Sequence, residues 1–348
     1  MVWRMPAETA PQSRIWMAFP RQGDVMGDSS AARAATYEAW ATVAHAILPF
    51  EPVTMVVDPS ELARARDMLD AGIDIVEAPL DDFWMRDFGP TFVIDDATGA
   101  LGGVDWIFNA WGQGADCERD ALIAERVIGE VAATRIPSLL VNEGGGIHVD
   151  GEGTVLVTET VQLDPDRNAW ATKERVEAEL TRTLGVSTVI WLPRGLTRDY
   201  DELGTRGHVD IVATFAAPGR VLVHAQHDPA HPDHAVMPEI YAALRDATDA
   251  RGRSLELIEL PAPAQLTDDE GYVDYSYVNH LVVNGGVIAC GFGDDHADAR
   301  AREILADAYP GRTVVTVDAR EIFARGGGIH CITQQQPAVG AAGGEARA

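Results

Sequence analysis

The pentapeptide Gly-Gly-Gly-Ile-His occurs twice in this 348-residue chain, at residues 144–148 and 326–330. Glycine-rich segments that recur before strands are typical of an internally repeated fold. Only the second copy continues into a cysteine, Cys331, where the first copy has Val149. A reactive side chain added to one copy of a repeat is typical of catalysis, so Cys331 is the first candidate nucleophile. The alternative is a buried free thiol, the commoner state of an unpaired cysteine.

Pairs of short apolar runs separated by turn residues recur along the chain and predict β-hairpins. The predicted pairs are 91–94 with 100–106, 147–149 with 154–158, 209–215 with 220–224, and 277–283 with 287–290, and a last strand covers 329–333. A polar residue stands at the mouth of one strand in each unit, namely Asp87, Glu143, His208, Asn279 and Cys331. This spacing divides the chain into five units of about seventy residues.

Helical patterns fill the segments between the hairpins. Asp58-Pro59-Ser60-Glu61 predicts a capped helix start, with a helix through Leu69 and strands at 53–57 and 73–76 on either side. Further helices are predicted at 31–48, 173–184, 237–251 and 298–308. The first of these has an apolar face made by Tyr37, Trp40, Val43, Ala44 and Ile47.

The repeated unit combines strand, helix, strand and hairpin and predicts the mixed α/β class. Five such units with a polar residue at the same strand end predict a pseudo-fivefold ring of ββαβ-type repeats that gathers those residues into one central site. We expect residues 1–337 to form a single catalytic domain, with a frayed Gly/Ala-rich tail at 338–348.

The formal net charge of −27 argues against a nucleic-acid partner, because binding phosphates requires a basic face. It favours a positively charged substrate, although an acidic surface can also serve only to keep a protein in solution. Cys117, Cys290 and Cys331 contain no Cys-x-x-Cys pair, which indicates a reducing compartment. No apolar run reaches membrane-spanning length and no secretory leader is recognisable. We therefore expect a cytoplasmic protein without a membrane partner, and a homo-oligomer stays open.

Chemistry at the predicted centre follows from the residue types that meet there. A histidine beside a thiol can stabilise the thiolate or exchange its proton, and His208 is the best candidate. Alternation along the predicted strand places His208 and Asp210 on the same face. Together with Asp87 and Glu143, Asp210 suits a planar guanidinium, whose N–H fork matches paired carboxylates. Trp84 could cover the face of that cation.

Five segments strongly resemble the agmatine deiminase family over almost the whole chain. They are 82–93 (DFWMRDFGPTFV), 108–112 (FNAWG), 143–154 (EGGGIHVDGEGT), 207–210 (GHVD) and 326–337 (GGGIHCITQQQP). The resemblance implies a five-bladed α/β propeller of the pentein superfamily with no metal or organic cofactor. It also implies the conversion of agmatine and water to N-carbamoylputrescine and ammonia through a covalent amidino-cysteine.

The resemblance carries roles to particular residues. Cys331 is implied as the nucleophile, His208 as the acid/base, and Glu143 as the group that holds the guanidinium near it. Asp87 and Asp210 are implied as a carboxylate clamp, with Asp210 also in the catalytic set. Gly327 and Gly328, in the run from Gly326, would let the backbone approach the substrate closely.

Departures from the family pattern leave the substrate open. Gly328 meets Ile329 directly, where the agmatine enzymes usually have an intervening Asn, and the loops after Gly114 and before Tyr275 are short. Specificity depends on contacts at the variable end of a pocket, so peptidylarginine, free arginine or another guanidino compound stay as alternatives.

Two other functional classes also stay open. A metal hydrolase could use His224, His227, His231 and His234, although Pro229 and Pro232 interrupt a helix that would align them. A non-catalytic binder of guanidino ligands could keep Asp87 and Asp210, but the joint presence of Cys331, His208 and Glu143 argues against it.

Overall fold

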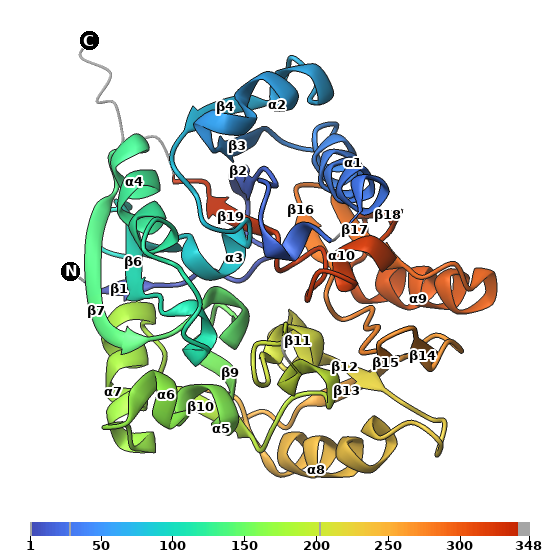
Figure 1. Ribbon diagram of the computed structural model, residues 1–348. Helices are drawn as coiled ribbons and strands as arrows, with labels where there is room; N and C mark the ends of the chain where they lie inside the picture. Colours follow the sequence, from blue (N-terminus) through green and yellow to red (C-terminus); the bar gives the residue numbers. More distant parts are fainter. Residues whose placement is uncertain (1, 28, 202, 340–348) are drawn as a thin grey trace.

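The computed structural model describes residues 2–27, 29–201 and 203–339. These residues form five sheets of three or four strands and one two-stranded sheet. Figure 1 shows helices α1 (Ser30–Ile47), α2 (Leu62–Met68), α4 (Ile123–Glu130), α7 (Lys173–Leu184), α8 (Asp233–Asp246) and α9 (Asp295–Ala308) toward the outside of the molecule, with β2 (Gln12–Ala18) and β19 (Thr333–Pro337) nearer its middle. The mixed α/β class predicted from the sequence is confirmed, because helices alternate with strands along the described chain and each of the larger sheets contains parallel strands joined through helices.

Four of the five larger sheets share one topology: an antiparallel hairpin, then a helix, then a strand parallel to the second hairpin strand. The second unit contains β5 (Thr91–Asp95), β6 (Leu101–Ile107), α4 (Ile123–Glu130) and β7 (Thr134–Val141), with β1 (Trp3–Arg4) added beside β5. The third contains β8 (Ile147–Val149), β9 (Thr154–Thr158), α5 (Glu159–Gln162), α6 (Pro165–Asn168), α7 (Lys173–Leu184) and β10 (Thr188–Leu192).

The last two of these units follow the same order. The fourth contains β11 (Ala213–Ala217), β12 (Arg220–Ala225), α8 (Asp233–Asp246) and β13 (Glu256–Pro261), followed by the small pair β14 (Thr267–Asp268) and β15 (Gly271–Tyr272). The fifth contains β16 (Leu281–Val283), β17 (Gly286–Gly291), α9 (Asp295–Ala308), β18 (Thr313–Asp318) and α10 (Arg320–Phe323).

The remaining sheet joins the two ends of the chain. Its members are β19 (Thr333–Pro337), β2 (Gln12–Ala18), α1 (Ser30–Ile47), β3 (Val53–Val57), α2 (Leu62–Met68) and β4 (Asp74–Glu77). Strand β19 pairs antiparallel with β2, whereas β3 and β4 follow in parallel. The first unit is therefore assembled from sequence ends more than 300 residues apart, as the pairing of Gln336 with Arg14 illustrates.

Local sequence explains several element bounds. Asp58 accepts a hydrogen bond from the Ser60 N–H at the start of the predicted 58–69 helix, which begins as a 3-10 turn before α2. The predicted apolar face of α1 is buried, with Trp40 and Ile47 fully inaccessible. Helix α7 has the predicted bounds, and its αL C-cap is Gly185.

Helix α8 corrects the prediction of a helix at 237–251. It begins directly after Pro232 and contains Pro238. It ends at Asp246 because the next residues form a turn in which the Asp249 carboxylate accepts hydrogen bonds from the N–H groups of Arg251 and Arg253. Local hydrogen bonding to an aspartate side chain thus replaces the last predicted helical turn.

Two further observations complete the fold. The Ala338 N–H donates to the carbonyl of Pro11, so the predicted frayed tail is attached at its first residue, and its part at 340–348 lies outside the described residues. Within the described part of the chain, no helix has the length and apolar character needed to cross a membrane.

Candidate functional site

The polar residues singled out at the strand mouths occupy equivalent places in the five units. Each stands a few residues before a strand that enters an antiparallel pair: Asp87 before β5, Glu143 before β8, His208 before β11, Asn279 before β16 and Cys331 before β19, whose partner is β2. Three of these positions lie in or next to short helical turns, namely α3 (Met85–Phe88), a 3-10 turn at Gly144–Gly146 and another at Val209–Ile211. All five side chains therefore come from the same position in the repeated unit, the segment that leads into its first strand.

Two local predictions at these positions are wrong. His208 and Asp210 do not alternate along a strand, because His208 precedes the 3-10 turn and β11 begins only at Ala213. Cys331 likewise precedes its strand, which begins at Thr333 instead of Ile329. A tight turn, and not strand alternation, sets the relative directions of the His208 and Asp210 side chains.

Cys331 lines a cavity of about 360 Å³ together with Trp84, Asp87 and Trp111. Its Sγ lies 3.5 Å from Oδ2 of Asp210 and 3.3 Å from Nδ2 of Asn279. The side chain is only 5% exposed, but the cavity reaches it. Cys331 is therefore not sealed in apolar packing, which was the alternative for an unpaired thiol.

Asp87 is held by two donors. The indole N–H of Trp111 donates to Oδ2 at 2.9 Å and the backbone N–H of Gly145 donates to Oδ1 at 3.1 Å. The Nδ1 atom of His208 lies 3.8 Å from the same Oδ1 and has no hydrogen-bond partner within the described residues. Asp87, which lines the cavity, thus faces the buried imidazole of His208.

Glu143 joins His208 to a buried arginine. Its Oε2 lies 3.1 Å from His208 Nε2, and its Oε1 accepts from Arg167 Nε at 2.9 Å. Arg167 also binds Asp164 and the carbonyl of Thr205, and its side chain is inaccessible to solvent. A buried carboxylate with these partners keeps its charge without water.

The surroundings of Glu143, His208 and Asp87 shift the pKa of each group differently. Burial favours the neutral acid of Glu143, but Arg167 and His208 outweigh it and lower its pKa to about 2. Burial would lower the pKa of His208, yet Asp87 and Glu143 raise it to about 9. Burial, with Glu143 and Asp210 nearby, raises the pKa of Asp87 to about 6 despite His208. At neutral pH the site therefore holds an imidazolium between two carboxylates.

The pKa of the Cys331 thiol is shifted so that the neutral form is favoured. Burial first, and then the negative charges of Asp210 and Asp87, raise the pKa of Cys331 well above its ordinary value, although the Gly328 N–H and Asn279 oppose the shift. An empty site therefore favours the thiol, and a cation placed among these carboxylates would favour the thiolate.

Glycines leave the space in which these groups meet. A Cβ on Gly145 would lie 2.4 Å from Nδ1 of His208, and one on Gly328 would lie 2.3 Å from Oδ1 of Asn279. A Cβ on Gly327 would lie 2.7 Å from the Trp84 ring and 3.1 Å from Cys331 Sγ. Both Gly-Gly-Gly-Ile-His copies thus pass too close to site side chains to carry a side chain themselves.

Several supporting residues escaped the sequence reasoning. Asp199 accepts from the N–H groups of Thr205, Gly207 and His208 and fixes the turn that presents His208. Arg167 and Trp111 hold the two acids, and Trp111 does so from a left-handed backbone with φ 55°. The sequence marks Asn279 only by its position at a strand mouth. That position is the one signal that could have assigned it to Cys331.

The four clustered histidines have separate partners. His224 binds the Ser276 hydroxyl, His231 the Val273 carbonyl and His234 the Gln226 carbonyl, while His227 Nε2 lies 3.5 Å from Oε2 of Glu259. Among the described residues, metal-ligand spacing is found for one other group only, Glu8, His148 and His330. The metal site considered from the sequence at 224–234 is therefore not assembled.

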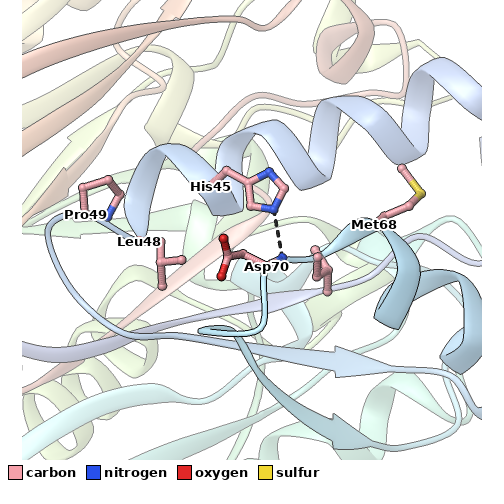
Figure 2. Close-up of a pocket in the computed structure, with 6 residues that line it drawn as sticks. His45, Leu48, Pro49, Met68 and Asp70 are labelled. Carbon is pink, nitrogen blue, oxygen red and sulfur yellow. Dashed lines mark hydrogen bonds between the residues drawn. The ribbon is translucent and has the colours of Figure 1, made fainter.

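A more open cavity of about 570 Å³ lies elsewhere, between the end of α1 and the loop that follows α2 (Figure 2). It is lined by His45, Leu48, Pro49, Met68, Leu69 and Asp70. His45 Nε2 accepts a hydrogen bond from the Asp70 N–H at 3.1 Å, which leaves it occupied in joining the helix to the loop. This lining has His45 and Asp70 as its titratable residues and holds no nucleophile, whereas Cys331 lines the smaller cavity together with Asp82 and Asp87, so the smaller cavity is the candidate site.

Comparison with known proteins shows the family to which the chain belongs. Residues 4–337 match the Porphyromonas-type peptidyl-arginine deiminase family. A Streptomyces coelicolor protein with a provisional agmatine deiminase name is 55% identical over 340 residues, covering 97% of this chain and 99% of the relative. The agmatine deiminase of Stutzerimonas stutzeri is 43% identical over 359 residues, covering 96% and 95%.

A solved structure extends the likeness to three dimensions. The agmatine deiminase of Enterococcus faecalis superposes with a TM-score of 0.91 at 35% identity, covering 97% of each chain. The resemblance found in the sequence motifs is thereby confirmed over nearly the whole length. The chain belongs to the Porphyromonas-type peptidyl-arginine deiminase family, and within it to the agmatine deiminases.

Proposed function

We propose that this protein hydrolyses agmatine to N-carbamoylputrescine and ammonia through a covalent amidino-cysteine intermediate. The observation that carries the proposal is the meeting of Cys331 and Asp87 in one cavity, with Asp210 3.5 Å from the sulfur. A thiol surrounded by carboxylates suits a cationic guanidinium carbon as its target. The named agmatine deiminases among the relatives support the same substrate.

The clamp would hold the guanidinium through its N–H groups. Asp87 and Asp210 are the two acceptors, and Oδ1 of Asp210 is buried without a hydrogen-bond partner in the described residues. Glu143 would bind the guanidinium nitrogen nearest to His208, while Trp84 covers the planar face. Gly327 and Gly328 would leave room for the substrate beside the sulfur.

The first chemical half would release ammonia. The substrate cation offsets the negative charges that raise the pKa of Cys331, so the thiol loses its proton to solvent. The thiolate attacks the guanidinium carbon, and the C–N bond to one terminal nitrogen breaks as His208 donates its proton to that nitrogen. Ammonia leaves, and the substrate stays attached through a C–S bond.

The second half would release the ureido product. His208, now neutral, accepts a proton from water as the water oxygen attacks the same carbon. The C–S bond then breaks, and the hydroxyl proton of the intermediate passes to the departing sulfur, which restores the thiol and leaves the neutral ureido product. His208 keeps the proton it took from water and is again charged beside Asp87 and Glu143. Each half uses one proton transfer by His208, so the cycle closes without another group.

We also propose that the five ββαβ units form the blades of one α/β propeller and that residues 1–337 are a single catalytic domain. The common topology of the sheets and the pairing of β19 with β2 support this arrangement. A ring of blades would explain why five equivalent strand mouths deliver residues to one cavity.

The test is incubation with agmatine, arginine and an arginyl peptide, with ammonia and ureido product measured for each. We expect turnover of agmatine only, unchanged by a chelator. Turnover confined to the arginyl peptide would contradict the small-substrate assignment, and loss of activity in chelator would contradict the metal-free mechanism.

A further inference from the structure

The histidines of the two Gly-Gly-Gly-Ile-His copies meet at one carboxylate from the N-terminal segment. His330 Nε2 lies 2.8 Å from Oε1 of Glu8, and His148 Nε2 lies 3.7 Å from the same oxygen. Glu8 is 6% exposed and lies in the loop between β1 and β2, which a hydrogen bond from Gln12 Nε2 to the Glu8 carbonyl stabilises. A residue 322 positions before His330 therefore shares its immediate surroundings.

His330 is bound by a carboxylate at each ring nitrogen. Its Nδ1 lies 2.8 Å from Oδ2 of Asp210, the same distance as Nε2 from Glu8. A neutral imidazole has one N–H and could donate to only one of two ionised acids. Two contacts of this length therefore require the doubly protonated ring, an imidazolium between two carboxylates.

The two copies of the motif differ in this respect. His148 Nδ1 accepts a hydrogen bond from the Phe215 N–H, so its proton is on Nε2, which contacts the Thr214 hydroxyl at 2.6 Å. His330 has no such donor at either ring nitrogen among the described residues. The copy that precedes the cysteine thus has the imidazolium, and it lies beside the acid that contacts the sulfur.

The geometry points to Glu8 as a positioning residue: through protonated His330, it holds Asp210 ionised and oriented for the guanidinium. This inference rests on the proposed deimination, in which Asp210 binds the substrate. Glu8 contacts neither Cys331 nor the cavity lining in the structure. Besides the two histidines, its carboxylate lies 3.5 Å from Arg86 Nη1 and accepts from Gln335 Nε2 at 3.3 Å. Its effect passes through His330, because His330 is the partner that is itself hydrogen-bonded to Asp210.

Charges around the pair favour this arrangement. Burial would raise the pKa of Asp210, but the hydrogen bond and charge of His330, with help from His208 and Arg86, lower it below its ordinary value. Burial and Arg86 would lower the pKa of His330, and Glu8 and Asp210 raise it. Loss of the Glu8 charge would therefore weaken both effects together.

Other titratable groups face the same pair. Those around His330 are Glu8, Asp210, Arg86, His148 and His280. Those around Asp210 are His330, His208, Arg86, Asp87, Cys331 and Cys290. Glu8 is the acid in the first set that neither lines the cavity nor touches the sulfur, so it can be changed without removing a group that itself touches the substrate.

The test compares Glu8→Gln and Glu8→Asp with the matched control Glu51→Gln. Glu51 is also buried, accepts from Asn284 Nδ2 at 2.7 Å, and does not line the cavity. For Glu8→Gln we expect the acid limb of kcat/KM for agmatine to gain a second step below that of Asp87, because the pKa of Asp210 shifts upward by about one unit, with KM about tenfold higher on that limb and kcat less affected. Glu8→Asp should restore part of the shift, and Glu51→Gln should keep the wild-type profile.

An unchanged pH profile and KM in folded Glu8→Gln would overturn the inference while leaving deimination intact. Failure of the wild type to deiminate agmatine would instead overturn the proposed function. Neutron diffraction from wild-type crystals gives a readout that needs no variant. Deuterons on both ring nitrogens of His330 are expected, and a single deuteron would overturn the inference even if Glu8→Gln does not fold.

Discussion

The Nε2 atom of His208 lies 3.1 Å from Oε2 of Glu143, and neither side chain is more than 2% exposed. Arg167 occupies the other oxygen of the same carboxylate. This arrangement holds the imidazole ring by a charged partner on one side and leaves Nδ1 turned toward Asp87. The ring is therefore positioned and charged before any substrate arrives, which suits a proton donor to a leaving group.

Replacing Glu143 with Gln should impair both catalysis and stability. The change removes the charge that holds His208 and leaves Arg167 with one fewer anionic partner in a fully buried place. We expect kcat/KM for agmatine to fall by about a hundredfold or more, and the free energy of unfolding to fall by about 3 kcal/mol. Ammonia release and denaturant unfolding measure the two effects.

The control is Asp318→Asn. Asp318 pairs with Arg320 at the surface, where both side chains are about half exposed. Its loss should cost less than about 1 kcal/mol and leave the rate unchanged. Equal destabilisation by the two variants would contradict the account of Glu143 as a buried charge.

Activity should be confined to a window of pH. As pH falls through about 6, Asp87 gains a proton and the clamp loses a charge, so KM should rise. As pH rises through about 9, His208 loses its proton and can no longer donate to ammonia, so kcat should fall. A profile of kcat/KM between pH 5 and 10 checks both limbs, and a flat profile would contradict them.

The free energy of unfolding should also depend on the protonation of His208 as the pH rises above neutral. The pKa of His208 is raised in the folded protein, so its contribution to stability is complete below about 6.5, the usual value for the unfolded chain. That contribution should be lost as pH rises toward about 9. A His208→Gln protein should lack this component of the pH dependence of unfolding.

Gly145→Ala should reduce activity strongly, because its Cβ would lie 2.4 Å from His208 Nδ1 and 3.0 Å from Asp87 Oδ1. Either the ring or the carboxylate has to move, and small displacements of catalytic groups cost about a hundredfold in rate. Gly129→Ala is the matched control, since nothing lies within 4 Å of its Cβ position in α4. The control should be fully active and stabilised by up to about 1 kcal/mol.

The sequence predicted the repeated units because turn residues and apolar runs are local signals. The bounds of α7 and β3 match the predictions residue for residue, and the hairpin of β8 and β9 does so as well. The helix at 237–251 failed because the Asp249 side chain competes for backbone N–H groups, which periodicity does not register. The predictions that strands already include residue 208 and residue 329 are wrong, because turns come first and the strands β11 and β19 begin only after them.

The site was predicted to the extent that its residues share a place in the repeat. Asp87, Glu143, His208 and Cys331 stand at equivalent strand mouths, so one rule found them all. Arg167 and Trp111 lie outside that rule, and their contacts with Glu143 and Asp87 depend on packing between units. The contact of Glu8 with His330 could not be predicted, because no local pattern connects two residues 322 positions apart.

Ammonia release from agmatine by Cys331→Ala tests covalent catalysis most directly. The account predicts loss of activity in a folded protein that still binds agmatine through Asp87 and Asp210, because the sulfur that attacks the guanidinium carbon is gone. Wild-type activity in that variant would contradict the account, whatever the behaviour of His208 and Glu143.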